Sequence, residues 1–116
     1  MSLSTHVLDA ALGLPAAGMA VRLEAADAAG GWAVLVETRT DRDGRAREVF
    51  GHPPSDAPTA GRYRLVFDTA GYFAGQGVKE YFYPEVVVCF AVVDPAAHYH
   101  VPLLLSPFAY STYRGS

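Results

Sequence analysis

The chain has 116 residues, of which 51% are hydrophobic and 18% are charged, and its formal net charge at pH 7 is −3. A chain of this size and composition is expected to form a single globular domain over residues 1–116 and not to remain disordered. Because the charge is weakly negative and no basic stripe runs along the chain, nucleic acid and anionic membrane surfaces are poor candidates for partners.

The first half of the chain alternates between apolar and polar residues, which predicts four short β-strands. The alternating segments are residues 3–9, 19–25, 32–40 and 45–50. In the first of them Leu3, Thr5 and Val7 share one face. If that face packs on the core, His6 points toward solvent or an interface.

Glycine, proline and aspartate mark the connections between these segments. Loops and turns are expected at residues 13–18, 27–31, 41–45 and 51–60. Within the third of these, Gly44 is expected to supply the positive φ angle that a tight turn needs.

The second half of the chain predicts further strands and little helix. Strands are expected at residues 62–68, 85–93 and 98–105, one or two helical turns at 71–77, and a closing strand after the turn at Ser106-Pro107. About eight short strands with one short helix indicate an all-β fold, an antiparallel β-sandwich.

Residues 85–93 are apolar on both faces of the expected strand, which predicts a strand buried on both sides. The only cysteine, Cys89, lies in it and is expected to be a buried, inert thiol. Together with the apolar residues 102–105, this strand suggests that one sheet face is covered by another subunit.

No segment suggests export or membrane insertion. The longest apolar run, residues 86–93, is far too short to span a bilayer. Residues 1–6 lack the charged and then apolar pattern of a signal peptide. A single cysteine cannot form an internal disulfide, so a reducing, cytoplasmic location is expected.

The stretch from residue 98 to residue 116 carries polar groups that a core does not need. His98 and His100 stand two residues apart in an alternating run, so they share one face of a strand. Chain ends are usually frayed. This one is aromatic and charged, with Tyr113, Arg114 and Ser116, so we expect it to be docked and used.

Three side chains are candidates for chemistry: His6, His100 and Arg45. A neutral imidazole is the side chain best suited to take a proton from water near neutral pH. A guanidinium offers a planar set of donors to an oxyanion. Each of the three is, taken alone, more often a solvated surface residue. The two histidines gain weight only if their strands are neighbours.

Metal binding is the weaker interpretation of the same residues. The spacing of His98 and His100 suits two ligands on one strand face, and His6 could join them in space. No Asp, Glu or Cys near them in the sequence completes a ligand set, so no metal or other cofactor is expected. Residues 41–44 resemble the opening of a calcium loop but lack its closing Glu, which favours a plain turn.

Taken together, four segments resemble the 5-hydroxyisourate hydrolases, the transthyretin-related enzymes of urate breakdown. The matching segments are residues 3–9 (Leu-Ser-Thr-His-Val-Leu-Asp), 40–45 (Thr-Asp-Arg-Asp-Gly-Arg), 98–107 (His-Tyr-His-Val-Pro-Leu-Leu-Leu-Ser-Pro) and 113–116 (Tyr-Arg-Gly-Ser). Transthyretin itself shares the fold but lacks that terminus and carries other residue types where His6, Arg45 and His100 stand.

The resemblance implies a transthyretin-like sandwich that assembles as a homotetramer of paired dimers. A channel would run between the dimers, with the active sites at their interface. The strands that bear His6, Arg45 and His100 would line this channel together with the C-terminus.

The resemblance also implies a reaction, the hydrolysis of 5-hydroxyisourate to 2-oxo-4-hydroxy-4-carboxy-5-ureidoimidazoline, without metal, cofactor or covalent intermediate. His6 and His100 would activate water, with the base unassigned between them, and Arg45 would hold the substrate and the developing oxyanion. Tyr113 and Ser116 would orient the substrate or the water. The alternatives are a carrier of a small aromatic ligand and a metal-dependent hydrolase.

Overall fold

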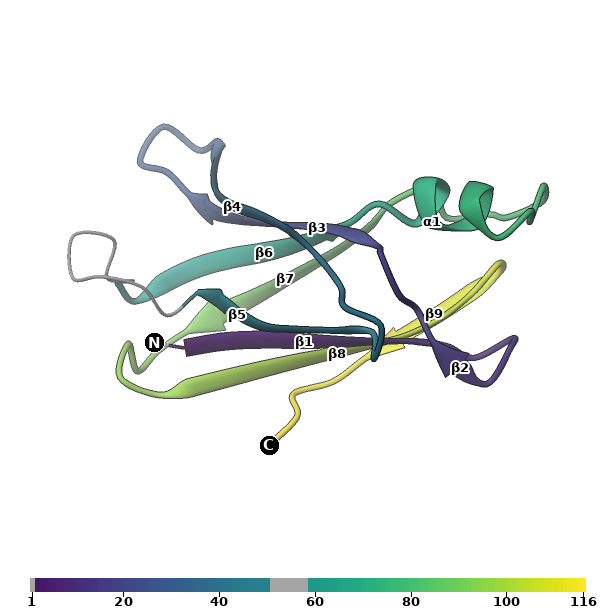
Figure 1. Cartoon of the computed structure of the whole chain (residues 1–116). Coiled ribbons are helices and arrows are strands. Elements are labelled where there is room, and N and C mark those ends of the chain that lie inside the picture. The colour runs from purple at the N-terminus through teal and green to yellow at the C-terminus, as the bar shows by residue number, and fades with distance from the viewer. Residues whose placement is uncertain (1, 51–58) are drawn as a thin grey trace.

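The computed structural model describes residues 2–50 and 59–116, which form two β-sheets packed face to face (Figure 1). In chain order the elements are β1 (Ser2–Asp9), β2 (Leu14–Pro15), β3 (Ala20–Ala26), β4 (Trp32–Arg39), β5 (Arg45–Phe50), β6 (Gly61–Phe67), α1 (Thr69–Gly75), β7 (Val86–Val92), β8 (His98–Ser106) and β9 (Ala109–Thr112). The expected strands are therefore present. The loop expected at residues 51–60 lies mostly outside the described residues.

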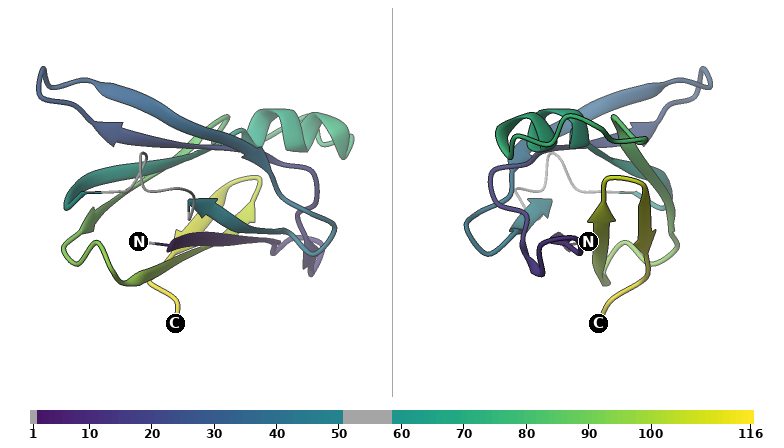
Figure 2. Two further views of the ribbon diagram at one scale, coloured as in Figure 1. Left: turned by 60° about the vertical axis from the view of Figure 1, so that its left-hand side comes forward. Right: turned by 90° about the vertical axis from the view of Figure 1, so that its right-hand side faces the viewer.

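The first sheet has the strand order β2-β1-β8-β9, and β5 pairs with β1 as well. The second sheet has the order β4-β3-β6-β7. Two further views show the helix at one end of the second sheet, while the C-terminal tail leaves β9 and passes along the outer side of the first sheet (Figure 2). The described residues contain no helix long and apolar enough to cross a membrane.

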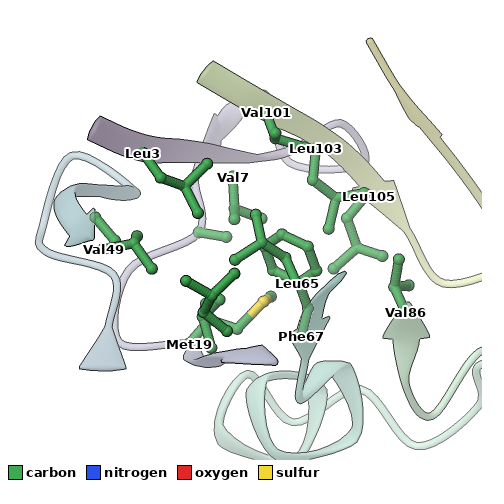
Figure 3. Packing of buried hydrophobic residues seen from close by; sticks show 14 of the residues in the cluster. Leu3, Val7, Met19, Val49, Leu65, Phe67, Val86, Val101, Leu103 and Leu105 are labelled. Carbon is green, nitrogen blue, oxygen red and sulfur yellow. The ribbon is translucent and has the colours of Figure 1, made fainter. Parts of the chain in front are cut away.

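The core lies between the two sheets and is built from the alternating residues of both (Figure 3). Leu3, Thr5 and Val7 of β1 are fully buried, as their shared face predicts. Leu65 of β6 and Leu103 of β8 are also fully buried. Burial of one face of β1 turns the other face, with His6, away from the core.

The helix begins two residues earlier than expected, at Thr69 and not at residue 71. The side chain of Asp68 accepts a hydrogen bond from the backbone N–H of Gly71 (3.0 Å) and so caps the first turn. The aromatic residues Tyr72 and Phe73 then point into the core.

Within the single chain, β7 is not buried on both faces as expected, and the expected cover by another subunit stays a prediction. Val86 and Val92 are buried, but Val87 is 41% exposed, and Cys89 between them is exposed as well. The reason is that the outer face of β7, an edge strand paired with β6, is not covered by any other layer formed by residues 2–50 and 59–116. Cys89 is therefore a solvent-accessible thiol in the single chain and not a buried one.

The sandwich is also not purely antiparallel. β1 and β8 pair in parallel, from Ser2 opposite His98 to Asp9 opposite Leu105. A parallel pair needs a long connection between its strands, and here all four strands of the second sheet lie between them in the sequence. This pairing places the N-terminal strand directly beside the histidines of β8.

Candidate functional site

The expected site residues gather on the outer face of the first sheet, around the central strand β1. His6 lies opposite Arg45 in the antiparallel pair of β1 and β5. On the other side of β1, Ser4 lies opposite His100 in the parallel pair with β8. Paired residues and residues two apart share a face, so all four side chains project from the same surface. The two histidine strands are therefore neighbours.

The turn before β5 positions Arg45. The carboxylate of Asp41 accepts hydrogen bonds from the backbone N–H groups of Asp43 (2.8 Å) and Arg45 (3.0 Å). The hydrogen bond from the Arg45 N–H has the largest effect of these contacts and lowers the pKa of the Asp41 carboxyl below its usual range. The turn is thus locked at both ends by one ionised side chain.

Gly44 brings this turn against β1, and its φ of 77° confirms the expected positive angle. The carbonyl oxygen of Gly44 accepts from the N–H of Val7 (2.7 Å). A Cβ atom at Gly44 would lie 2.3 Å from the Val7 carbonyl oxygen, closer than atoms can approach. Only glycine fits, both in conformation and in space.

The same turn orients His6, which is half-buried. Nε2 of His6 lies 2.9 Å from the carbonyl oxygen of Asp43. A carbonyl oxygen can only accept, so Nε2 carries the hydrogen and donates it. In the neutral ring, Nδ1 then holds the free lone pair.

His100 is held by the protein at Nδ1, whereas His6 is held at Nε2. Its Nδ1 lies 2.7 Å from Oγ of Ser4, and its Nε2 makes no hydrogen bond to any residue of 2–50 or 59–116. Burial, the positive charge of Arg45 and the nearby imidazoles of His98 and His6 lower the pKa of His100. The ring is therefore neutral near pH 7, with one nitrogen held by protein and the other open.

The C-terminal tail is docked, as expected, and closes over His100. The backbone N–H of Gly115 donates to the carbonyl oxygen of His100 (2.8 Å). A Cβ atom at Gly115 would lie 2.5 Å from Cδ2 of the His100 ring, so only glycine allows this approach. Ser116 is the next residue after Gly115 in the sequence. Arg114 is anchored separately, with its guanidinium carbon 4.7 Å from the centre of the Tyr99 ring.

A cavity of about 230 Å³ lies between β7 and the tail. Its lining includes His100, Tyr113, Arg114, Tyr99 and Cys89. His6 and Arg45 are not among its lining residues. The structure therefore places Tyr113 beside His100. His6 on β1 and Arg45 on the neighbouring β5 lie outside this cavity, on the open face of the first sheet.

The three histidines do not form a metal site. In the part of the chain that the structure describes, no three His, Cys, Asp or Glu side chains form a group that could hold a metal ion. His98 and His100 are held by serine hydroxyls instead.

Sequence reasoning missed Ser4 as part of the site. Alternation in β1 places it on the same outward face as His6. Its contact with His100 depends on the pairing of two strands far apart in the sequence. The outward position of Ser4 was the only signal available.

A family model described as the HIUase/Transthyretin family matches residues 3–115 of the chain. The 5-hydroxyisourate hydrolase of Caulobacter vibrioides is 47% identical over 118 residues, covering 98% of this chain and 97% of that protein. The 5-hydroxyisourate hydrolase of Mus musculus is 45% identical over 115 residues, covering 98% and 94%.

Two solved structures share the fold over almost their whole length. The 5-hydroxyisourate hydrolase of Klebsiella pneumoniae superposes with a TM-score of 0.84 at 34% identity and covers 100% of both chains. Transthyretin from Sparus aurata superposes with a TM-score of 0.87, also at 34% identity, and covers 98% of this chain and 96% of that one. The expected transthyretin-like sandwich is confirmed, and the chain belongs to the HIUase/Transthyretin family.

Proposed function

We propose that the chain is an enzyme that hydrolyses 5-hydroxyisourate to 2-oxo-4-hydroxy-4-carboxy-5-ureidoimidazoline in urate breakdown. The observation that carries this proposal is the convergence of two imidazoles, a guanidinium and the C-terminal tail on one sheet face. The Caulobacter and mouse relatives, named 5-hydroxyisourate hydrolase, support it at 47% and 45% identity.

A carrier of a small aromatic ligand is the second candidate, because transthyretin has the same fold. The TM-scores of 0.87 for transthyretin and 0.84 for the hydrolase do not separate the two functions. The side chains on the outer face of the first sheet favour the hydrolase. Carriage needs shape and apolar contact, whereas a neutral imidazole with an open nitrogen beside a guanidinium suits proton transfer.

The reaction begins with attack of water on a ring carbonyl. We assign the base to Nε2 of His100, because Nδ1 is held by Ser4 and the lowered pKa keeps the ring neutral. The hydroxide adds to the carbonyl carbon, the ring C–N bond breaks, and the leaving nitrogen takes a proton. His6, whose Nε2 hydrogen is fixed by Asp43, can make that second transfer from Nδ1 once Nδ1 has taken up a proton, so it acts as an imidazolium in this step.

Arg45 and the tail hold the substrate. The guanidinium of Arg45 donates to the carbonyl oxygen that becomes negative during attack. Tyr113 lines the same cavity as His100, and Ser116 follows the docked Gly115; in this proposal both orient the substrate or the water. Neither a metal nor a covalent intermediate takes part.

The assembly we propose is a homotetramer with the active sites where two dimers meet, in the cytoplasm. Two features of the single chain support an assembly. The cavity beside His100, about 230 Å³, is smaller than most ligand pockets. Large apolar side chains are also exposed, such as Phe82 at 68% and Phe108 at 65%.

A direct assay tests the activity. 5-Hydroxyisourate is made in place with urate oxidase, and its ultraviolet absorbance is followed with and without the chain. We expect faster decay with the chain, and unchanged activity after exhaustive chelation. Decay at the spontaneous rate, with stable retention of the ligand, would favour the carrier.

Variants test the roles of the residues. We expect His100→Ala to lower turnover by about 10²–10⁴-fold, the range of a positioned base. Arg45→Ala is expected to lower it by about 10²–10³-fold, the range of one oxyanion donor. His6→Ala should lower it strongly as well. Each variant should keep the mass of the wild-type assembly in light scattering. Wild-type turnover in all three would refute the assignment.

A further inference from the structure

Two serines of β1 and two histidines of β8 form a continuous chain of hydrogen bonds on the outer sheet face. Ser2 lies opposite His98, and Ser4 lies opposite His100. Ser2 Oγ contacts Nδ1 of His98, and Nε2 of His98 lies 3.3 Å from Oγ of Ser4. Oγ of Ser4 then lies 2.7 Å from Nδ1 of His100. Ser4 is thus the link between the two rings.

The hydrogens of this chain can be counted. The Ser4 hydroxyl has one hydrogen to donate and two lone pairs that can accept. It can therefore donate to one histidine only, and the other histidine must donate to it. If His100 is the base, its Nδ1 carries hydrogen and donates to Ser4, because Nε2 must be free to accept. Ser4 then donates to Nε2 of His98.

The two histidines of this hydrogen-bond chain differ in their exposure to solvent. His100 is half-buried beneath the tail, against Gly115. His98 is exposed to solvent. The series of hydrogen bonds through Ser4 therefore leads from His100, whose Nε2 is the proposed reacting nitrogen, to His98 at the surface of the molecule.

We propose that Ser4 and His98 form the path by which the proton taken up by His100 leaves the site. This inference rests on the proposed function. When Nε2 of His100 takes a proton from water, its Nδ1 proton passes to Ser4. The proton of Ser4 passes to Nε2 of His98, and the imidazolium of His98 releases its Nδ1 proton to solvent. One proton enters and one leaves, and the hydrogen of His100 has moved from Nδ1 to Nε2. After the product has left, Nε2 gives this proton to solvent and a proton returns through His98 and Ser4 to Nδ1, which restores the starting tautomers.

The reaction needs such a path. Its product carries a new carboxyl group, and carboxyl groups ionise far below neutral pH, at about 3.3–4.3. Each turnover at neutral pH therefore leaves one proton to be discharged. The tail packs against the His100 ring on the side away from Ser4, which limits direct exchange with solvent once substrate is bound.

A structural role for Ser4, as a tie between β1 and β8, makes a different prediction from a proton path. If Ser4 only holds β1 and β8 together, a buffer molecule cannot restore the activity lost with it. If Ser4 transfers protons, a small buffer base can accept the proton in its place and restore turnover. The test therefore compares turnover in dilute, poorly accepting buffer with turnover in concentrated imidazole, after subtracting the rate without enzyme.

We expect Ser4→Ala to lower kcat in dilute buffer on the order of tenfold, at the low end of what a positioned proton transfer supplies. KM should change little, and imidazole should restore kcat. Ser4→Thr keeps a hydroxyl and should stay near wild type. His98→Ala removes the outer end and should show a smaller loss with the same rescue. Ser2→Ala is the matched control, because it removes only a contact of His98 Nδ1 and leaves that nitrogen open to solvent, so kcat should stay near wild type.

The possible results distinguish a failure of the proton path from a failure of the proposed function. Wild-type kcat of His98→Ala in dilute buffer, or a loss in Ser4→Ala that imidazole does not relieve, would overturn the path. His98 is exposed, so its variant remains informative even if Ser4→Ala fails to fold. A wild-type chain that does not accelerate decay in either buffer would instead refute the proposed function.

Discussion

The two imidazoles of the site present opposite nitrogens to the substrate side. His6 donates from Nε2 to the carbonyl oxygen of Asp43, which leaves Nδ1 free. His100 is held at Nδ1 by Ser4, which leaves Nε2 free. Both rings therefore present a lone pair in their neutral form, and each can donate a proton from its open nitrogen only after that nitrogen has taken one up.

The pKa of His100 is a testable property at this scale. Burial first, and then the charge of Arg45 and the imidazoles of His98 and His6, lower it below the ordinary histidine value of about 6.5. An imidazole with a lowered pKa remains mostly neutral at pH 6.5. It becomes protonated, and so stops acting as a base, only at a lower pH. The acid limb of the activity profile should therefore lie below pH 6.5.

The ring-proton chemical shift of His100, followed by NMR against pH, measures this directly. Arg45→Gln removes a positive charge, so we expect the midpoint to rise toward the ordinary value without reaching it, because burial remains. Arg62→Gln, an exposed position on the second sheet, should leave the midpoint unchanged. A wild-type midpoint at or above the ordinary value would contradict the environment described here.

At the scale of elements, the turn at residues 41–45 serves both halves of the site, because it carries Arg45 and orients His6. Gly44→Ala should destabilise the fold by about 2–4 kcal/mol, since the left-handed conformation costs about 1–2 and a backbone clash adds to it. Gly77→Ala is the matched control, with a φ of 73° and open space around it. It should cost only about 1–2 kcal/mol.

Chemical denaturation at one fixed protein concentration compares the two variants. We also expect Gly44→Ala to lose activity, because Val7 and the turn must move apart and carry Arg45 with them. Equal destabilisation by the two alanines would show that the close approach of Gly44 to Val7 has no energetic weight.

The elements were largely predictable from local pattern, and their partners were not. Alternation in residues 3–9 identified a strand and turned His6 outward, and β5 has the expected bounds. Apolar content at residues 85–93 identified a strand, but composition cannot tell whether a second layer covers it, so the exposure of Cys89 was missed. The parallel pairing of β1 with β8 is a long-range choice, and the role of Ser4 follows only from it.

At the scale of the whole molecule, the proposed tetramer makes the activity depend on association. His6 and Arg45 lie on an open face, and the cavity beside His100 excludes them, so a single chain leaves the substrate largely exposed to water. A second copy over this face would enclose it. Specific activity should therefore fall on dilution, in step with the loss of tetramer seen by light scattering.

Two surface variants separate association from folding. Phe108, 65% exposed in the turn between β8 and β9, lies beyond the end of the strand that carries His100. Phe108→Asp should weaken association and lower activity at a given concentration, because a charge at a buried contact is costly. Leu35→Asp changes a residue that is 44% exposed on the edge strand β4 of the other sheet, and should change neither mass nor activity. If the isolated chain keeps full turnover, each site is complete within one copy, and the outer face of the first sheet needs no partner to do its chemistry.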